Sequence, residues 1–428
     1  MATTTPNFGW PVPTSTDLVK DGATAIEALG DAIDASLVDL EGGTTGQILA
    51  KASNADMDFA WITNDVGDIT AVTAGTGITG GGTSGAVTVS FDQANFGGGQ
   101  FAAGKNKIIN GAFNVWQRGT SATVPIANNS FSGPDRFQFS RNGSGSVVTV
   151  SRQAFTPGTA PVAGYEGNYF MRFNQTTAGT GGSYNQIITR MEDVTTYAGQ
   201  TVTFSFWAKA DSSRTLAVPV LNQNFGAGGS SQVGTNITLN SSALTTAWTR
   251  YTGTVTLPSI SGKTIGTSSY LEIDLGTFLN TTFTFDTWGW MLESGSTATP
   301  FQTATGTLQG ELSAAQRYYQ RFGAKNGQTV GTNATYGTGF TTSTTGVNIT
   351  VPFPVTMRIT PTAIEYASIT AYDAALTQYT PSAVALVAGQ SGLDAGNVQF
   401  TVTGATAARA AVIIQSATTG YLAFSAEL

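Results

Sequence analysis

The sequence predicts a mostly β protein, with a short coiled-coil and β shaft, a jelly-roll β-sandwich and a small C-terminal β domain. Thr, Gly, Val and Phe are abundant and only 11% of residues are charged, which is typical of all-β proteins. Strand-like alternation recurs through residues 105–302. The front quarter has few apolar side chains, so we expect it to intertwine with sister copies. The four expected parts are residues 1–43, 44–104, 105–305 and 306–428.

Composition excludes several classes of function. The chain has no His and no Cys, which removes routine nucleophilic, proton-shuttling and zinc chemistry, and no disulfide is possible. A net charge of −7 disfavours nucleic acid as a partner and polybasic attachment to membranes. The sequence has neither an 18-residue apolar run nor a signal-peptide pattern. We therefore expect no membrane insertion and no cofactor.

Residues 1–16 are punctuated by Pro and aromatic residues and are expected to be extended, without a core of their own. One interpretation is a frayed terminus. The other is a docking peptide in which Phe8 and Trp10 fill pockets on a partner. Two aromatic side chains beside rigid prolines favour docking.

Residues 22–40 are expected to form a helix that begins after Asp21 as N-cap and stops at Gly42-Gly43. Its apolar residues recur at spacings of three and four, which places them on one face. A helix of this length is marginal alone in water, so the face is expected to pack against copies of itself or a neighbouring subunit. The candidate core residues are Ile26, Leu29, Ile33, Leu37 and Leu40.

The shaft is expected to begin with a hairpin, one strand at residues 47–52 and its return at 57–62. Two short strands, 69–74 and 86–91, then flank a glycine loop. A phosphate-loop interpretation of Gly75-Thr76-Gly77 is rejected, because neither the Lys-Ser/Thr pair nor a following helix is present.

Residues 105–305 are expected to form about ten strands, the size of a jelly roll with two sheets face to face. Leu271, Ile273 and Leu275 alternate with Glu272 and Asp274, so these two acids are expected on a solvated outer face. The expected strands are residues 107–116, 135–140, 147–155, 169–174, 185–191, 201–209, 215–222, 249–257, 270–275 and 282–292.

The C-terminal part is expected to open with a helix at residues 311–321 that Gly323 ends. A small β domain follows. Its expected strands are residues 332–341, 347–353, 362–366, 398–403, 410–416 and 422–427.

Four segments together resemble the tail fibres of tailed bacteriophages. Residues 6–17 with 21–26 resemble the virion-attachment end, and residues 68–85 resemble a recurrent shaft element. The segment Asn110-Gly-Ala-Phe-Asn-Val-Trp-Gln-Arg-Gly-Thr120, with Asp135-Arg-Phe137, resembles the start of the carbohydrate-binding-module-like jelly roll of these fibres. Residues 292–301 and 315–321 resemble its end. Phe137 departs from the family pattern, which often has Trp there.

The resemblance implies a parallel homotrimer, attached by its N-terminus to the phage tail or baseplate, that adsorbs to a bacterial surface glycan. It also implies a virion protein, made in the host cytoplasm and acting outside the cell. Two alternatives stay open: a tailspike-type depolymerase on the same rod, and a structural connector whose adhesive tip is another protein.

Aromatic side chains are the first candidates for glycan contact, because sugar CH groups stack on flat π-faces. Trp116 and Trp207 are expected in the core. Trp288 and Trp290 share a strand face, which leaves room for one of them to be exposed. Tyrosines beside polar loops are the candidates in the C-terminal domain. The glycan-binding candidates are Trp288, Trp290, Tyr336, Tyr372, Tyr379 and Tyr421.

Glycan cleavage would need two acids flanking the scissile bond. The close pairs Asp56/Asp58, Glu192/Asp193 and Glu272/Asp274 lie in no recognisable motif, so we expect no enzyme. Asp135 with Arg136 is expected to be a structural ion pair or turn. Oxygen ligands would suffice for a structural Ca²⁺, but no Asp-x-Asp loop of suitable spacing indicates one, so no metal is expected.

Overall fold

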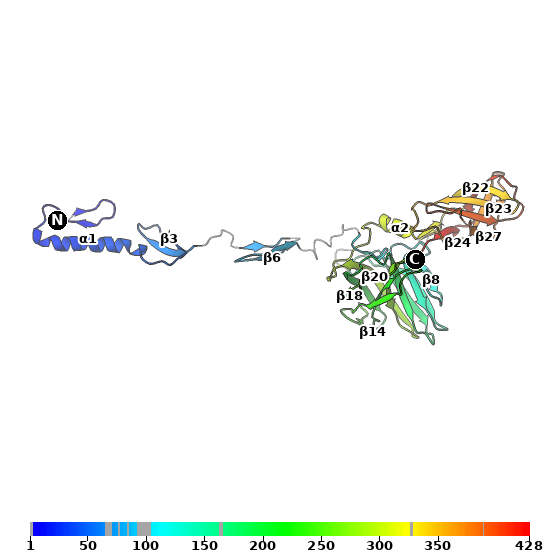
Figure 1. The fold of residues 1–428 in the computed structure, drawn as a ribbon, viewed down its shortest axis with the longest axis horizontal. Helices are drawn as coiled ribbons and strands as arrows, with labels where there is room; N and C mark the ends of the chain where they lie inside the picture. The colour runs from blue at the N-terminus through cyan, green and yellow to red at the C-terminus, as the bar shows by residue number, and fades with distance from the viewer. Residues whose placement is uncertain are drawn as a thin grey trace. The chain divides into compact units, whose positions relative to one another are not determined.

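The computed structural model describes residues 3–64, 71–75, 78–83, 85–91, 104–161, 166–325, 328–387 and 389–428. The chain divides into two compact units, Met1–Ser90 and Phe91–Leu428. Figure 1 labels the elements of both. Within the described residues, no helix is long and apolar enough to cross a membrane.

The first residues of unit one fold back on a helix. Strand β1 (Thr3–Thr4) pairs with β2 (Pro11–Val12) in an antiparallel hairpin beside α1 (Gly22–Leu37) (Figure 1). The Trp10 indole Nε1 donates to Ser36 Oγ of α1 at 2.9 Å, and the Phe8 and Trp10 rings stack with centroids 4.9 Å apart. The expected extended segment was therefore wrong, because the hairpin pairs its own backbone.

Helix α1 confirms the expected helix, and its apolar stripe, formed by Ile26, Leu29, Ile33, Leu37 and Leu40, is not buried. The 3₁₀ turns η1 (Val19–Asp21) and η2 (Val38–Leu40) flank it. Throughout Gly22–Leu37, all described, no side chain is buried. Ile26 is 64% exposed, Leu37 37% and Leu40 38%, while Leu29 and Ile33 are half-buried. One copy of the chain therefore does not cover this stripe.

The expected hairpin is confirmed as β3 (Gln47–Lys51) paired with β4 (Phe59–Thr63). Beyond it, β5 (Val72–Thr73), β6 (Ile78–Gly82) and β7 (Val89–Phe91) form a small sheet. The glycine-loop prediction was wrong at β6, while the start of the expected strand 69–74 lies outside the described residues. A Cβ on Gly80 or Gly81 would meet backbone oxygens of neighbouring strands at 2.2 and 2.4 Å. Only glycine allows this close approach.

Unit two opens with an antiparallel sandwich, which confirms the expected two-sheet architecture. In the described part, one sheet has the order β18-β13-β20-β11-β10-β8 and the other β16-β15-β19-β12-β9. Their side chains meet in one core that includes Trp116, Phe137 and Trp290. The strands are β8 (Ser121–Val124), β9 (Phe137–Arg141), β10 (Val147–Ala154), β11 (Tyr169–Thr177), β12 (Asn185–Glu192), β13 (Thr201–Ala210), β14 (Arg214–Thr215), β15 (Val220–Asn224), β16 (Val233–Asn236), β17 (Ala243–Leu244), β18 (Thr249–Thr256), β19 (Tyr270–Gly276) and β20 (Phe283–Ser294).

The expected strand at residues 107–116 is instead a folded loop. Asn110 and Phe113 have positive φ values of 62° and 54°. The Asn110 side chain accepts from Val115 N at 2.9 Å and donates to Val115 O at 2.8 Å, so the backbone pairs locally. This side-chain pairing replaces a sheet ladder.

A single expected strand at residues 215–222 is in fact two, β14 and β15. Pro219 stands between them and has no N–H for a ladder. The short strands β8, β16 and β17 were not predicted, because two to four residues give too little alternation.

The C-terminal part begins with α2 (Leu308–Gln316), capped by the Thr307 side chain, which accepts from Gly310 N. The expected helix 311–321 was therefore displaced. Its second half, β21 (Tyr319–Gly323), pairs with β30 (Tyr421–Ser425), a strand about a hundred residues later. This non-local pairing overrides the local helical pattern.

Two further sheets enclose the second core, in which Phe400, Ile413 and Phe424 are buried. Their orders in the described residues are β21-β30-β24 and β26-β25-β29-β22-β23-β28-β27. The strands are β22 (Thr335–Ser343), β23 (Gly346–Pro352), β24 (Ala363–Ala367), β25 (Ile369–Asp373), β26 (Gln378–Tyr379), β27 (Ala383–Leu386), β28 (Ala395–Thr401) and β29 (Ala410–Gln415). Strands β25, β26 and β27 were not predicted.

The terminal domain is joined to the sandwich by buried charges. Glu427 lies between Arg118, at 3.3 Å, and Arg136. All three side chains are at most 7% exposed. Arg136 therefore pairs with Glu427 and not with Asp135, and its φ of 72° confirms the expected turn.

Candidate functional site

The outer face of the five-stranded sheet carries a dense set of polar side chains. Ile187 and Met191 of β12 point into the core, as do Leu271, Ile273 and Leu275 of β19. The alternate residues Gln186, Ile188, Arg190, Glu272 and Asp274 therefore point outwards. The register sets Arg190 opposite Glu272 and Ile188 opposite Asp274.

A hollow of about 330 Å³ lies on this face, and we call it the β12–β19 hollow. Amide, hydroxyl and carboxylate groups surround one aliphatic side chain, that of Ile188. The lining residues are Asn128, Asn129, Ser140, Tyr184, Gln186, Ile188, Glu272 and Asp274. Its volume is within the range of small-molecule sites.

Glu272 is neutralised within the protein. Its side chain pairs with Arg190, Nε to Oε2 at 2.6 Å, and Asn222 Nδ2 donates to Oε1 at 3.3 Å. Glu272 is only 7% exposed, so the solvated face expected at this residue was wrong. The cause is tertiary, because strands β12 and β15 flank β19 and cover its side chain.

Asp274 stands in a different environment. Gln186 Nε2 donates to Oδ2 at 2.5 Å, while Oδ1 is buried and has no hydrogen-bond partner among the described residues. Burial, and after it the charge of Glu272, raises the pKa of Asp274 to about 6. Because this half-buried carboxylate lines the hollow, its charge acts on a ligand bound there.

Two tyrosines bring aromatic surface to this face. Tyr184 lines the hollow, and its hydroxyl donates to Asn128 Oδ1 at 2.6 Å. Tyr270 starts β19, and the Arg190 guanidinium lies 4.5 Å from its ring centroid. The sequence analysis missed both, although Tyr270 continues the outward alternation of Glu272 and Asp274.

The last residue of the chain lies at the border of this face. The Leu428 carbonyl accepts from Gln138 Nε2 at 2.9 Å and from Arg190 Nη1 at 2.7 Å. Arg190 Nη2 also donates to Asn129 Oδ1 at 3.2 Å. One guanidinium thus connects the terminal domain, the acid Glu272 and a wall of the hollow.

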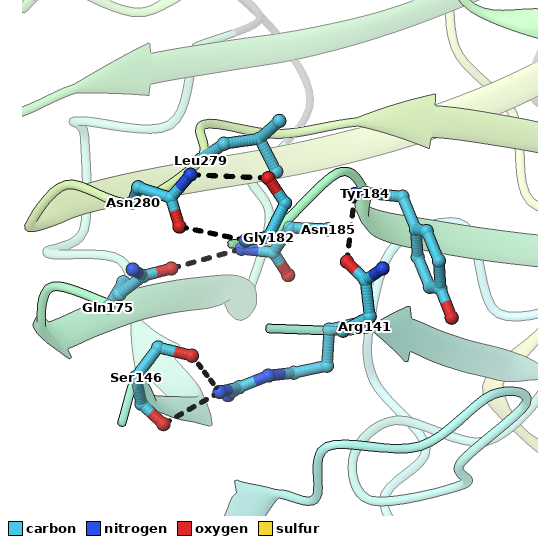
Figure 2. A pocket seen from close by; sticks show the side chains of 9 residues that line it. Arg141, Ser146, Gln175, Gly182, Tyr184, Asn185, Leu279 and Asn280 are labelled. Carbon is cyan, nitrogen blue, oxygen red and sulfur yellow. Dashed lines mark hydrogen bonds between the residues drawn. The ribbon is translucent and has the colours of Figure 1, made fainter. Parts of the chain in front are cut away.

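A second, much smaller pocket of about 10 Å³ shares Tyr184 with the hollow. Figure 2 shows the Arg141 guanidinium directed at Ser146, whose carbonyl accepts at 2.7 Å, and Asn280 directed at Gly182. Burial lowers the pKa of Arg141. The space suits about one water molecule and excludes a sugar ring.

The structure removes the two tryptophans from the candidates for glycan contact. Trp288 and Trp290 are both fully buried in the sandwich core, as are the expected core residues Trp116 and, at 6% exposure, Trp207. The Trp290 indole Nε1 donates to Thr287 Oγ1 at 2.7 Å. Trp288 packs against Trp207 and Phe301, and Trp290 packs against Phe204 and Phe206, so aromatic neighbours cover both rings.

The four tyrosine candidates of the terminal domain are engaged with neighbouring side chains. Tyr379 is 5% exposed and donates to Asp373 Oδ2 at 2.8 Å, which removes it as a contact residue. Half-buried Tyr336 donates to Gln415 Oε1, and half-buried Tyr372 to Gln378 Oε1 at 2.9 Å. The Arg321 guanidinium lies 3.5 Å from the ring centroid of half-buried Tyr421.

In unit one, the docking candidate Phe8 lines a recess of about 300 Å³ together with three acids, Asp39, Asp56 and Asp58. Two of the acids are engaged, since Asp39 accepts from Phe59 N at 3.3 Å and Asp58 accepts from Ser53 Oγ. Phe8 is 50% exposed and Trp10 half-buried. In the described part of the chain, no group of acids is arranged to hold a metal ion.

Comparison with known proteins connects this geometry to carbohydrates. Residues 126–269 match the model of a carbohydrate binding domain family. The match includes the Asn128, Ser140 and Tyr184 side of the hollow and ends just before Glu272. No curated protein matches the chain.

Several solved structures are similar at low identity. One is the enzymatically active domain of tailspike protein 4 of bacteriophage CBA120, with 15% identity and a TM-score of 0.27 over 45% of this chain. The chain spans only 22% of that tailspike chain. The xylan-binding domain of a Paenibacillus barcinonensis protein shows 14% identity and a TM-score of 0.25, covering 41% of this chain and 95% of its own.

A sugar binding protein of Bacteroides thetaiotaomicron, described as such only provisionally, shows 12% identity and a TM-score of 0.29. The similarity covers 44% of this chain and 100% of that chain. The family match, which falls on the sandwich, is the finding that bears on function. The protein thus contains a carbohydrate binding domain at residues 126–269, and carbohydrate binding is the activity that this match supports.

Proposed function

We propose that this protein is a bacteriophage tail fibre that recognises its host by binding a bacterial surface polysaccharide in the β12–β19 hollow. One observation carries the proposal: the sandwich, whose residues 126–269 match a carbohydrate binding domain family, presents an open hollow of about 330 Å³ lined by amides, hydroxyls and carboxylates. A sugar offers hydroxyls that both donate and accept, and such a lining provides partners for them.

The chemistry of the hollow suits a saccharide better than an apolar ligand. Gln186, Asn128 and Asn129 provide amide groups, and Ser140 provides a hydroxyl. Ile188 and the Tyr184 ring offer apolar surface to the CH groups of a pyranose. A ligand that leaves these polar groups unpaired binds less well, so they confer specificity.

The assembly part of the proposal concerns unit one. The open stripe of α1, with Ile26 and Leu37 exposed, supports association of chains through this helix. The sequence resemblance implies three parallel copies. We place attachment to the tail or baseplate at residues 1–40, where Phe8 and Trp10 form an aromatic pair, and the protein acts at the virion surface.

The binding test uses variants of the hollow in the full-length protein. Tyr184→Ala and Gln186→Ala are expected to lower binding to host cells about tenfold or more, because each removes contacts with the saccharide. Tyr366→Ala is the matched control, since Tyr366 is 41% exposed on β24 of the terminal domain. If both hollow variants bind host cells fully while the control variant loses binding, the adhesive site lies in the terminal domain and not in the hollow.

One result would contradict the adhesive role, and another would contradict attachment through the N-terminal segment. If the full-length protein does not bind cells that the virion infects, it is a structural connector. If removal of residues 1–40 leaves incorporation into particles unchanged, the attachment proposal fails.

A depolymerase is the second candidate, because Glu272 and Asp274 bring two acids to one hollow and the pKa of Asp274 is raised. We favour binding without cleavage, since Arg190 already neutralises Glu272 and both acids stand on the same strand face. Incubation with host polysaccharide is expected to leave the polymer size unchanged. A fall in size that Asp274→Asn abolishes would establish the enzyme.

A further inference from the structure

We propose that the β12–β19 hollow selects saccharides by charge, accepting neutral and amino sugars and rejecting uronic acids, with Asp274 as the specificity-determining residue. This inference rests on the proposed glycan binding and names the class of ligand. It follows from the charge balance of the lining residues.

Three charged groups stand on this part of the face: Glu272, Asp274 and Arg190. The Arg190 guanidinium bonds to Glu272 at 2.6 Å and turns its other nitrogens to Leu428 O and Asn129 Oδ1. Each of its three nitrogens therefore donates to a group other than Asp274. Among the described residues, Asp274 accepts from Gln186 and forms no ion pair, so the ionised hollow carries one uncompensated negative charge.

The elements packed against Asp274 add no second cation. Strand β12 contributes Gln186, Ile188 and Arg190, and strand β15 places the apolar Val220 opposite Asp274. The loop residues Asn128 and Asn129 are neutral, and Tyr184 is a phenol. Glu272 is the acid whose charge acts on Asp274.

An uncompensated carboxylate in a half-buried site discriminates strongly between ligands. A sugar hydroxyl donates a hydrogen bond to it, and a sugar ammonium adds a favourable charge interaction. A uronate would place a second negative charge beside it, where partial burial screens the repulsion less than bulk water does.

The titration of Asp274 gives the selection a pH signature. Above about pH 6 the carboxylate is ionised and the discrimination is complete; below this pH the acid is neutral and the penalty on uronates falls. Uronic acids remain charged at about pH 5, so the change in the penalty on uronates belongs to the protein.

The test is a saccharide array with matched sets that differ only in an amino, a hydroxymethyl or a carboxylate group. At about pH 8, the full-length protein is expected to bind uronate members roughly tenfold or more weakly than their neutral counterparts. Asp274→Asn should bring the two within about threefold, as should measurement of the unchanged protein at about pH 5.

Glu166→Gln is the matched control. It removes the same charge from an exposed loop position away from the hollow, and the preference should persist. Loss of preference in this control would assign the effect to net charge and overturn the inference. Equal binding of uronate and neutral members by the unchanged protein would overturn it while leaving glycan binding intact. Binding to no saccharide in the array and to no host cells would overturn both.

Discussion

Glu272 and Asp274 stand two residues apart on one strand, yet their surroundings give them different roles. Glu272 is closed off by Arg190 and Asn222, whereas Asp274 keeps one oxygen without a partner in the described structure. The first contributes to the sandwich, and the second is available to a ligand. This division arises at the level of single hydrogen bonds.

Asp274→Asn is expected to stabilise the protein above about pH 6. The folded-state pKa lies above the ordinary 3.8, so between about pH 4 and 6 the folded chain keeps a proton that the unfolded chain has released. Stability is therefore lost as pH rises through this window, and the amide avoids the loss. After allowance for solvent screening, the gain is about 1 kcal/mol. Denaturant unfolding at several pH values measures it; an equal difference at about pH 4 would contradict it.

Arg190→Met should destabilise the sandwich by about 3 kcal/mol, because it leaves Glu272 charged and buried without its partner. The double variant Arg190→Met with Glu272→Met should regain most of the loss, since no unpaired charge remains. Chemical denaturation of the full chain provides the comparison. A double variant as unstable as the single one would show that the lost contacts to Leu428 and Asn129 dominate.

At the scale of elements, close approach between strands and their neighbours explains several glycines. Gly289 lies in the middle of β20 with a φ of +68°, and a Cβ there would stand 2.7 Å from the Trp207 ring. A Cβ on Gly111 would likewise stand 2.1 Å from the carbonyl oxygen of Trp290. Neighbouring groups of the sandwich core therefore pack so closely at these two positions that only glycine is accommodated.

Gly289→Ala is expected to cost at least about 3 kcal/mol, from backbone strain together with the clash against Trp207. Gly262→Ala separates the two causes, because Gly262 has a φ of +73° and open space around it. This control should cost only about 1 kcal/mol. Thermal unfolding of both variants measures the difference, and equal losses would mean that strain alone acts.

The α1 stripe allows a test of association. Ile26→Asp should convert the expected trimer of 44.2 kDa chains to a monomer, because the substitution places a charge in the apolar seam between helices. Val218→Asp is the control, at a 54% exposed apolar position in the sandwich. Light scattering gives the masses. A monomer already in the unchanged protein would overturn the assembly proposal.

At the scale of unit two, the end of the chain fastens the terminal domain to the sandwich. Glu427 pairs with Arg118 and Arg136, and the aromatic rings of Tyr319 and Tyr318 lie 3.6 and 3.4 Å from these guanidinium groups. Leu428 continues to the border of the hollow. The terminal domain thus helps to shape the binding face.

Glu427→Ala should destabilise the contact by about 3–5 kcal/mol, because Arg136 loses its ion-pair partner while buried and Arg118 keeps only the more distant Glu365, at 3.9 Å. We expect a separate, earlier unfolding transition of the terminal domain and faster proteolysis between the domains. Asp394→Ala, at an exposed acid of the same domain, should change neither. Unfolding of the Glu427 variant at the unchanged temperature would contradict the prediction.

Elements with a strong local pattern could be predicted from the amino-acid order alone. The amphipathic repeat of α1, the β3–β4 hairpin and long alternating strands such as β13 and β19 were predicted, because periodicity encodes which side faces a core. Absence of His and Cys bounded the chemistry in the same way. The sheet face that carries Glu272 and Asp274 was also visible in the alternation.

Features that depend on contacts between residues far apart in the chain became visible only in the folded molecule. Tertiary contacts place Trp288 and Trp290 in the core, and they turn residues 319–323 from the expected helix into β21. They also bring Tyr184, which precedes β12, to the same hollow as Asp274 of β19. Periodicity identifies a face, but the pairing of strands far apart in the chain decides which faces are covered. The binding hollow depends on this pairing and could not be predicted from periodicity, because several strands and loops form it together.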